Sequence, residues 1–412
     1  MFAYLSFMRR NWPLLGFGFL TVFWGNFGQS FFIAWFGADI QQQLGLSAAT
    51  YGTAYSAATL LAALTVVWAG GLVDRIVLQR YVMLLGGGLC LACLVLTRVE
   101  GLVSLFLGLY LLRLFGQSLL PHTGMTSMGR YFRESRGRAI SVAMSGVPAG
   151  EIVLPAIAVA LIAVVGWQGT FAFIGVMTAV FLLPMLQWLL VRARPALARA
   201  RAEELRRDEQ GVTEAAGGGR RAVLTDYRFW LALPALMTTP FMVTGIFIHQ
   251  AFLVESKGWT LSWLALCFTL YGAVHWISSL ISGVLVDRFG ATRVLPLVQV
   301  PMLAALLVAA FMPGWWSAPV MMVLLGMAAG GGPPVTGSLW PRIYGTGRLG
   351  AIRAMTMALM VGATSVSPVL FGYFIDAGIS AGALFGYSAL YVVVALLLVS
   401  VSYPRDDRVC GA

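Results

Sequence analysis

Three ionisable side chains stand inside long apolar runs of this sequence: Arg113, Glu151 and His275. A charge within the hydrocarbon core of a membrane is costly, so such a residue usually faces a cavity or a partner and marks a functional site. A guanidinium holds a carboxylate through two parallel hydrogen bonds, whereas carboxyl and imidazole groups bind and release protons. We therefore expect all three residues to bind substrate, and Glu151 and His275 to couple transport to protons.

Arg113 and Glu151 also have a structural interpretation, which the sequence leaves open. Each helical residue adds about 1.5 Å, which places Arg113 roughly 16 Å and Glu151 roughly 18 Å from opposite faces of a core about 30 Å thick. At this depth the two residues either form a structural ion pair, or Arg113 binds an anion while Glu151 orients it or carries a proton. His275 lies at a similar depth and is equally well explained as a hydrogen-bonded packing residue.

Two uncharged polar positions, Gln29 and His249, complete the set of candidate substrate-binding residues. Both fall in apolar runs, where a polar side chain needs a partner or a water-filled cavity. The sequence has no group of His, Cys and acidic residues with the spacing of a metal site, and no catalytic cluster near either membrane face. We therefore expect no metal, no cofactor and no enzymatic activity.

The elements that must position these residues are membrane-spanning helices. The 412 residues are 59% hydrophobic and 10% charged, whereas a soluble domain has about 25% charged residues. This composition excludes a soluble domain, a disordered chain and a nucleic-acid-binding protein. Twelve apolar runs have the roughly 20 residues that a spanning helix needs, at 13–36, 50–73, 81–97, 102–128, 139–164, 167–191, 228–253, 261–286, 293–312, 317–339, 351–375 and 383–402.

The basic residues predict the orientation of these helices. Of the 27 Lys and Arg residues, 24 fall on one side of the twelve-helix arrangement. Because basic residues concentrate in cytoplasmic loops, both termini are expected in the cytoplasm. The net charge of +11 is explained by topology, so no nucleic-acid partner is needed. Compact loops and a single lysine favour a bacterial cytoplasmic (inner) membrane. We also expect membrane lipid as a partner and a monomeric protein.

An internal repeat relates the two halves of the chain at an offset of 213 residues. Gly70–Arg75 recurs as Gly283–Arg288, and matched Pro and Gly pairs such as Pro121 and Pro334 follow at the same offset. Matched Gly and Pro are informative because both residues mark special backbone conformations. We expect a six-helix bundle over 1–191, a cytoplasmic linker over 192–227, a second six-helix bundle over 228–402 and a cytoplasmic tail over 403–412.

The repeated loop resembles the signature of the major facilitator superfamily. Residues 283–293 fit the pattern G-x-L-x-D-R-x-G-x-x-R, while the first copy has Val77 at the second glycine position. The resemblance covers the whole chain and implies an all-α membrane protein with twelve transmembrane helices in two six-helix repeats. It also implies a secondary active transporter that works by alternating access around a midplane site.

The resemblance further implies a gating role for the charged loops. These positions are Gly70, Asp74, Arg75 and Arg130 in the first half and Gly283, Asp287, Arg288 and Arg342 in the second. The alternative is that they are charged stops that anchor helix ends. Gly331 and Pro334 belong to a separate run of Gly and Pro, which weakens a helix and predicts a bendable gate or a static kink.

A partial resemblance to the monocarboxylate and oxalate–formate carriers suggests the substrate. It rests on Gly28–Ser30, on residues 330–337 and on the span-eleven segment from Ser367 to Asp376. Gln29 stands where monocarboxylate carriers have a lysine, so Arg113 must supply the charge if the substrate is an anion. We expect a small organic anion, with a carboxylate and proton coupling. The alternatives are a proton-driven exporter of a hydrophobic or cationic compound and a non-transporting receptor.

Overall fold

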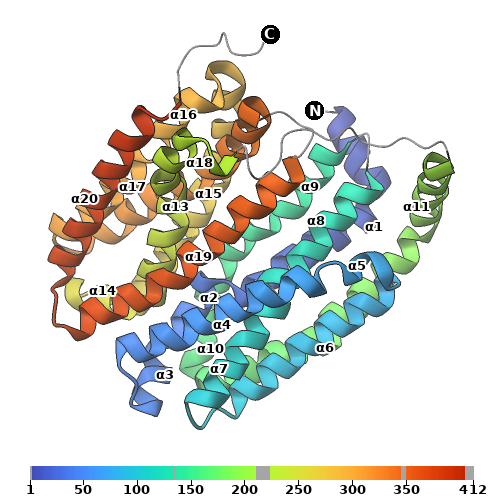
Figure 1. Cartoon of the computed structure of the whole chain (residues 1–412). Coiled ribbons are helices and arrows are strands. Elements are labelled where there is room, and N and C mark those ends of the chain that lie inside the picture. Colours follow the sequence, from blue (N-terminus) through green and yellow to red (C-terminus); the bar gives the residue numbers. More distant parts are fainter. Residues whose placement is uncertain (1, 133–134, 210–222, 345–348, 404–412) are drawn as a thin grey trace. The chain divides into compact units, whose positions relative to one another are not determined.

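The computed structural model describes residues 2–132, 135–209, 223–344 and 349–403, although the side chains of some residues in these ranges, Asp74 among them, are not described. Within these ranges every regular element is a helix, as Figure 1 shows. The predicted all-α class is therefore confirmed.

The described residues of the first half form fifteen helical elements, which include short 3-10 turns and two π-helical segments, η3 and η4. They are α1 (Phe2–Gly25), η1 (Asn26–Gly28), α2 (Ser30–Ile33), η2 (Ala34–Phe36), α3 (Gly37–Leu44), α4 (Ala48–Ala69), α5 (Leu72–Arg75), α6 (Leu78–Thr97), α7 (Leu102–Leu111), η3 (Leu112–Leu119), α8 (Leu120–Tyr131), α9 (Arg136–Met144), α10 (Gly146–Met177), η4 (Thr178–Leu182) and α11 (Leu183–Glu209).

The second half is more regular over the residues that the structure describes. Its helices are α13 (Tyr227–Ile248), α14 (Gln250–Lys257), α15 (Leu261–Phe289), α16 (Ala291–Leu297), α17 (Val300–Phe311), α18 (Ser317–Tyr344), α19 (Leu349–Asp376) and α20 (Ala381–Ser400).

Ten described segments are long and apolar enough to cross a membrane, by length and composition. One of them, Gly137–Pro195, contains two of the twelve predicted runs, because the backbone turns at Gly166, where φ is +72°. The first predicted run, 13–36, is divided among α1, η1, α2 and η2, so no single long helix carries it. These two differences account for the step from twelve runs to ten segments.

The repeat at 213 residues is visible in the helix boundaries. Helix α6 begins at Leu78 and α16 at Ala291 (78 + 213 = 291), while α8 ends at Tyr131 and α18 at Tyr344 (131 + 213 = 344). The two copies of the segment that ends at Tyr131 and Tyr344 differ in their helical structure. The first copy is interrupted by the π-helical η3, whereas α18 is one helix, so the repeat has diverged where Arg113 stands.

The chain folds into two compact units. The first contains residues 1–39 and 57–213, and the second contains 40–56 and 214–412, so α4 is divided between them. The predicted bundle boundaries at 191 and 228 stay a prediction. Helix α11 continues to Glu209, which extends the sixth predicted span into the predicted linker. Most of the remaining linker, 210–222, and the tail at 404–412 lie outside the described residues.

Glycines bring α15 and α18 into close contact in the second unit. A Cβ at Gly326 would lie 2.6 Å from the carbonyl oxygen of Tyr271, and one at Gly330 would overlap the carbonyl oxygen of His275. The Ser282 hydroxyl also donates to the Gly331 carbonyl at 2.8 Å. Small residues four positions apart allow two membrane helices to approach closely. The predicted gate in this Gly and Pro run stays a prediction, and its glycines have a packing role.

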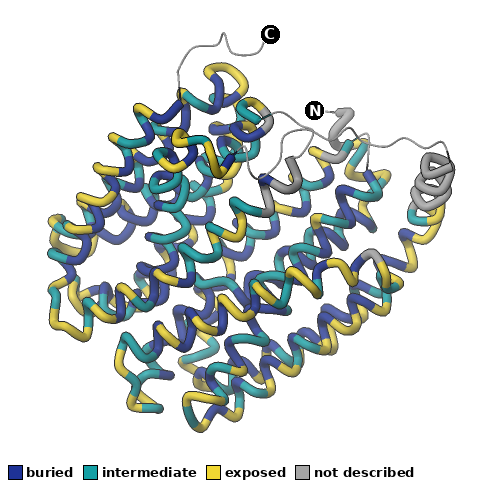
Figure 2. Tube along the Cα trace, viewed as in Figure 1, coloured by how far each residue is buried: buried dark blue, intermediate teal, exposed yellow. Residues whose placement is uncertain are grey.

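The surface of the helices carries many exposed apolar side chains, as expected where lipid is the solvent. Figure 2 shows exposed residues recurring along the lengths of the helices, between buried ones. Val103 and Val164 are more than four-fifths exposed. On a soluble protein such patches mark interfaces, whereas helices that cross a membrane present them to lipid.

The close approach of α15 and α18 makes a testable prediction. Gly330→Ala should lower the melting temperature, because an added Cβ must push the α15 backbone away, and overpacking costs about 1–3 kcal/mol. Gly332→Ala is the matched control. A Cβ there meets nothing within 4 Å, so alanine should leave stability unchanged or raise it by up to about 1 kcal/mol. Equal melting temperatures for the two variants would contradict the packing role.

Candidate functional site

The first membrane helix is broken where the candidate residue Gln29 stands. Helix α1 ends at Gly25, a 3-10 turn follows, and Gln29 is extended (φ −78°, ψ 153°) before α2 begins. A Cβ at Gly28 would overlap the amide nitrogen of Gln117, so only glycine allows the turn to lie against η3. Discontinuous helices of this kind build the binding sites of many transporters.

Arg113 forms a hydrogen bond that stabilises this break. It lies in η3, is 1% exposed, and its Nη1 donates to the carbonyl oxygen of Gly28 at 3.0 Å. A helix break leaves carbonyl groups without their usual partners, which is costly in the absence of water. A charged donor makes a stronger hydrogen bond than a neutral one. The π-helical turn, a feature frequent at functional sites, carries the side chain that contacts the break.

Asn26 connects the same break to α10. Its Nδ2 donates to the carbonyl oxygen of Gly146 at 2.8 Å, and a Cβ at Gly150 would overlap its amide group. Glu151, the next residue of α10, is 4% exposed. Both η3 and α10 pack against η1. Arg113 and Glu151 therefore lie on two elements that contact the same three-residue turn, which brings Gln29, Arg113 and Glu151 into one region of the first unit.

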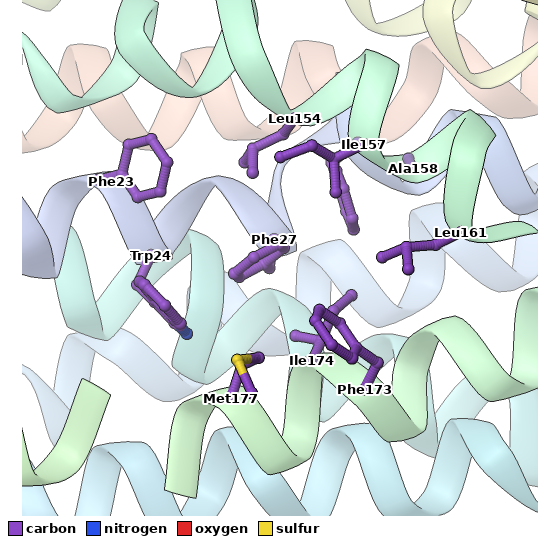
Figure 3. Close-up of a pocket in the computed structure, with 11 residues that line it drawn as sticks. Phe23, Trp24, Phe27, Leu154, Ile157, Ala158, Leu161, Phe173, Ile174 and Met177 are labelled. Atoms are coloured by element: carbon purple, nitrogen blue, oxygen red, sulfur yellow. The ribbon is translucent and has the colours of Figure 1, made fainter. Parts of the chain in front are cut away.

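An apolar pocket lies beside this region. Figure 3 shows Trp24 and Phe27 facing Leu154 and Ile157 from one arm of α10 and Met177 from the other. The cavity has a volume of about 170 Å³, and its lining is wholly apolar. The Trp24 indole Nε1 donates to the Thr178 hydroxyl at 2.9 Å, which fixes this aromatic wall. The sequence did not indicate the pocket, because its walls come from two distant segments, residues 23–32 and 154–177.

His249 occupies a second polar region, in the second unit. It separates α13 from α14, is 5% exposed, and its Nε2 lies 2.8 Å from the carbonyl oxygen of Pro368. A carbonyl only accepts, so this contact requires hydrogen on Nε2. The neighbouring Gln250 is 2% exposed, and neither atom of its amide has a hydrogen-bond partner in the part of the chain that the structure describes.

The N-terminus of α4 is capped by Asp376 at the end of α19. The two carboxylate oxygens accept from the backbone N–H groups of Ala48 and Ala49 at 3.0 and 2.9 Å. The fit is close, because a Cβ at Gly372 would lie 2.6 Å from the Ala48 carbonyl oxygen. A carboxylate satisfies the free N–H groups of a helix start and interacts favourably with the helix dipole. The sequence placed Asp376 only in a motif, without this role.

His275 lies on α15 and is half-buried. Its ring makes an edge contact with Tyr271, with ring centroids 5.9 Å apart. Its backbone carbonyl faces Gly330, in the α15–α18 interface. The structure therefore places His275 beside a packing contact, and its predicted roles in substrate binding and proton transfer stay predictions.

The predicted gating residues of the second copy lie at the corner between α15 and α16. Gly290, with φ +82°, is covered by the guanidinium of Arg342, which a Cβ would overlap. Asp287 and Arg288 are exposed, and Arg288 lies over the Phe289 ring at 5.3 Å. This corner brings Gly290, the second glycine of the motif, and Arg342, in the last turn of α18, together.

The first copy of this corner is less fully described. Arg75 is exposed, and Arg130, in the last turn of α8, is half-buried. A Cβ at Gly70 would lie 3.5 Å from the ring of His122. The side chain of Asp74 lies outside the described residues. The gating role of both copies stays a prediction.

The Asp376 cap predicts a loss of stability that depends on charge. Asp376→Ala should destabilise the protein by about 1 kcal/mol, because two helix-terminal N–H groups lose their acceptor. Asp376→Asn should lose only part of this stability, because the amide oxygen of asparagine still accepts one hydrogen bond. Glu255→Gln removes an exposed charge elsewhere in the same unit and is the control. Thermal unfolding in detergent measures all three, and an unchanged Asp376→Ala variant would contradict the cap.

Comparison with known proteins agrees with this architecture. The family model described as Major Facilitator Superfamily matches residues 15–274 and 236–409. A solved structure, a bacterial homologue of the human lysosomal transporter Spinster in an inward-facing and unoccupied conformation, has a similar fold, with a TM-score of 0.66 at 15% identity. The match covers 95% of this chain and 96% of that one. No curated protein matches in sequence. The chain belongs to the major facilitator superfamily, a family of multi-pass membrane transporters.

Proposed function

We propose that this protein is a secondary active carrier of a small organic anion, in which Arg113 supplies the positive charge that binds a carboxylate. Family membership establishes the transporter class, and the substrate class rests on one observation. A buried guanidinium contacts the break of the first membrane helix. Arginine keeps its charge when buried and grips a carboxylate with two parallel hydrogen bonds, which suits it to this role.

The position of Arg113 also links binding to conformational change. Because the guanidinium is 1% exposed, a carboxylate reaches it only in a state in which the surrounding groups have moved. A ligand shifts a conformational equilibrium by its difference in affinity between two states. An anion that binds Arg113 in the opened state alone would therefore favour that state, as alternating access requires.

The second unit has buried polar groups of its own that suit a polar substrate. His249 and Gln250 are both buried, and the Gln250 amide offers a donor and an acceptor that no described protein atom satisfies. A buried amide without hydrogen bonds costs about 1–3 kcal/mol. A polar substrate that binds Gln250 recovers that cost, so Gln250 and His249 form the proposed polar binding residues of the second unit, while Gln29 is proposed for the first.

Proton coupling is proposed through Glu151 or His275. Glu151 lies on α10, which packs against the same helix break as Arg113. A bound anion changes the charge around a nearby carboxyl group, and so changes how readily that group binds a proton. Such a difference between two states is what couples a proton to transport.

The export of a hydrophobic compound is the second candidate function. It is favoured by the wholly apolar pocket beside the helix break. The two candidates differ in what they transport, so a panel of labelled carboxylates and apolar cations, offered to proteoliposomes with and without a pH gradient, distinguishes them. We further propose a bacterial cytoplasmic membrane, with both termini in the cytoplasm, and a monomer.

Arg113 gives the sharpest prediction. Arg113→Lys should weaken anion affinity by about 2–3 kcal/mol, roughly 30- to 150-fold, because an ammonium cannot form the bidentate grip. The protein should remain folded, since lysine can still donate one bond to the Gly28 carbonyl. Equilibrium binding of the transported carboxylate and the melting temperature measure the two effects separately.

A double change tests the structural alternative for Arg113. If it is only the ion-pair partner of Glu151, then Arg113→Gln and Glu151→Gln should each reduce stability, and the double variant should recover both stability and transport. If Arg113 binds the substrate, the double variant stays inactive whatever its melting temperature. A double variant that still binds and moves the anion would exclude the binding role.

Glu151 gives the prediction for proton coupling. Glu151→Gln should abolish uphill transport driven by a pH gradient but permit downhill exchange, because the amide cannot take up a proton. His275→Gln tests the other candidate in the same assay. His122→Gln is the control, a histidine of α8 that lies 3.5 Å from the Thr126 hydroxyl of its own helix. Wild-type transport that does not respond to a proton gradient would contradict coupling altogether.

A further inference from the structure

The apolar pocket of the first unit lies outside the polar contacts of the proposed anion site. Its walls come from α1, η1, α2 and the two arms of α10, which meet at the turn around Gly166. Figure 3 shows the side chains of Phe27, Leu154 and Ile174 pointing into a common space. No polar surface lines this space, so nothing in it recognises a charged or hydrogen-bonding ligand.

The opening of the pocket lies on a surface of purely apolar character. Ile157 and Phe173, one from each arm of α10, are 43% and 44% exposed and line the pocket. Every exposed residue of α10, from Val153 to Val176, is apolar or glycine. A water-filled path would expose polar side chains here, whereas a surface in contact with lipid carries none. The pocket is therefore continuous with the lipid-facing surface of the helix.

The size of the pocket matches part of a hydrocarbon chain. Its volume is about 170 Å³, and a dry apolar cavity of about 150 Å³ is large enough to bind benzene. This space accepts a bent segment of several methylene groups but not a lipid headgroup, which has no polar partner there.

We propose that this pocket binds an acyl chain of a membrane lipid, which enters between the arms of α10 past Ile157 and Phe173. The occupant contacts Phe27 of η1, one residue before Gly28, whose carbonyl accepts the Arg113 hydrogen bond. The lipid chain thus packs against the broken segment next to its polar contacts. A transported hydrophobic compound is the rival occupant, and the apolar exposed surface of α10 favours a chain that enters from the surrounding lipid.

Photo-crosslinking in lipid nanodiscs tests the proposal. The full-length protein is placed in nanodiscs that contain a phospholipid with a diazirine on its acyl chain, and after illumination the labelled peptides are identified by mass spectrometry. Residues 154–161 and 173–177 should carry lipid adducts. Ile157→Trp, which narrows the opening, should lose most of these adducts, and Ala158→Phe, which fills the cavity, should do the same.

The control is Val164→Trp, which adds the same bulk to an exposed position of the same arm outside the pocket lining. This variant should carry the same lipid adducts as the wild type. The melting temperature of each variant confirms that it is folded. Equal labelling of Ile157→Trp and Val164→Trp, or no adducts on the pocket residues of the wild type, would overturn the proposal.

Discussion

The hydrogen bond from the Arg113 guanidinium to the Gly28 carbonyl is the contact on which the first unit depends. A membrane helix can break only where its freed backbone groups find partners inside the protein, because lipid offers none. Here one buried side chain supplies a charged donor from a π-helical turn, and Asn26 ties the break to the carbonyl of Gly146. The broken turn, the π-helical turn and α10 form one mutually dependent arrangement, in which each irregular segment is stabilised by the others.

The two repeats pack the helices that contain Arg113 and Gly326 in different ways. At the position that corresponds to Arg113 the second copy has Gly326, and there α18 runs unbroken against the backbone of α15. In the first copy, a long charged side chain occupies that position and the helix widens to accommodate it. Shared boundaries at an offset of 213 residues show a common plan, and the asymmetry places the buried Arg113 in the first unit. In the second unit, His249 contacts the backbone of α19, and Asp376 contacts the start of α4.

Polar and apolar features lie side by side around the broken helix. Asn26 and Gly28 make the polar contacts, while Trp24 and Phe27 on the same short segment line the apolar pocket. One short broken segment thus combines charge-assisted hydrogen bonds with apolar burial.

The sequence by itself determined the helical membrane class, the repeat and the family, because hydropathy, basic-residue bias and matched Gly and Pro are local properties of the chain. It also singled out Arg113 and Glu151, since a charge in an apolar run is visible without coordinates. Only the tertiary structure decided that the first span is broken at Gln29, that Arg113 binds a backbone carbonyl, that Asp376 caps α4 and that an apolar pocket lies between the arms of α10. Those features join residues up to 328 positions apart, and no local pattern records which backbone groups a distant side chain will satisfy.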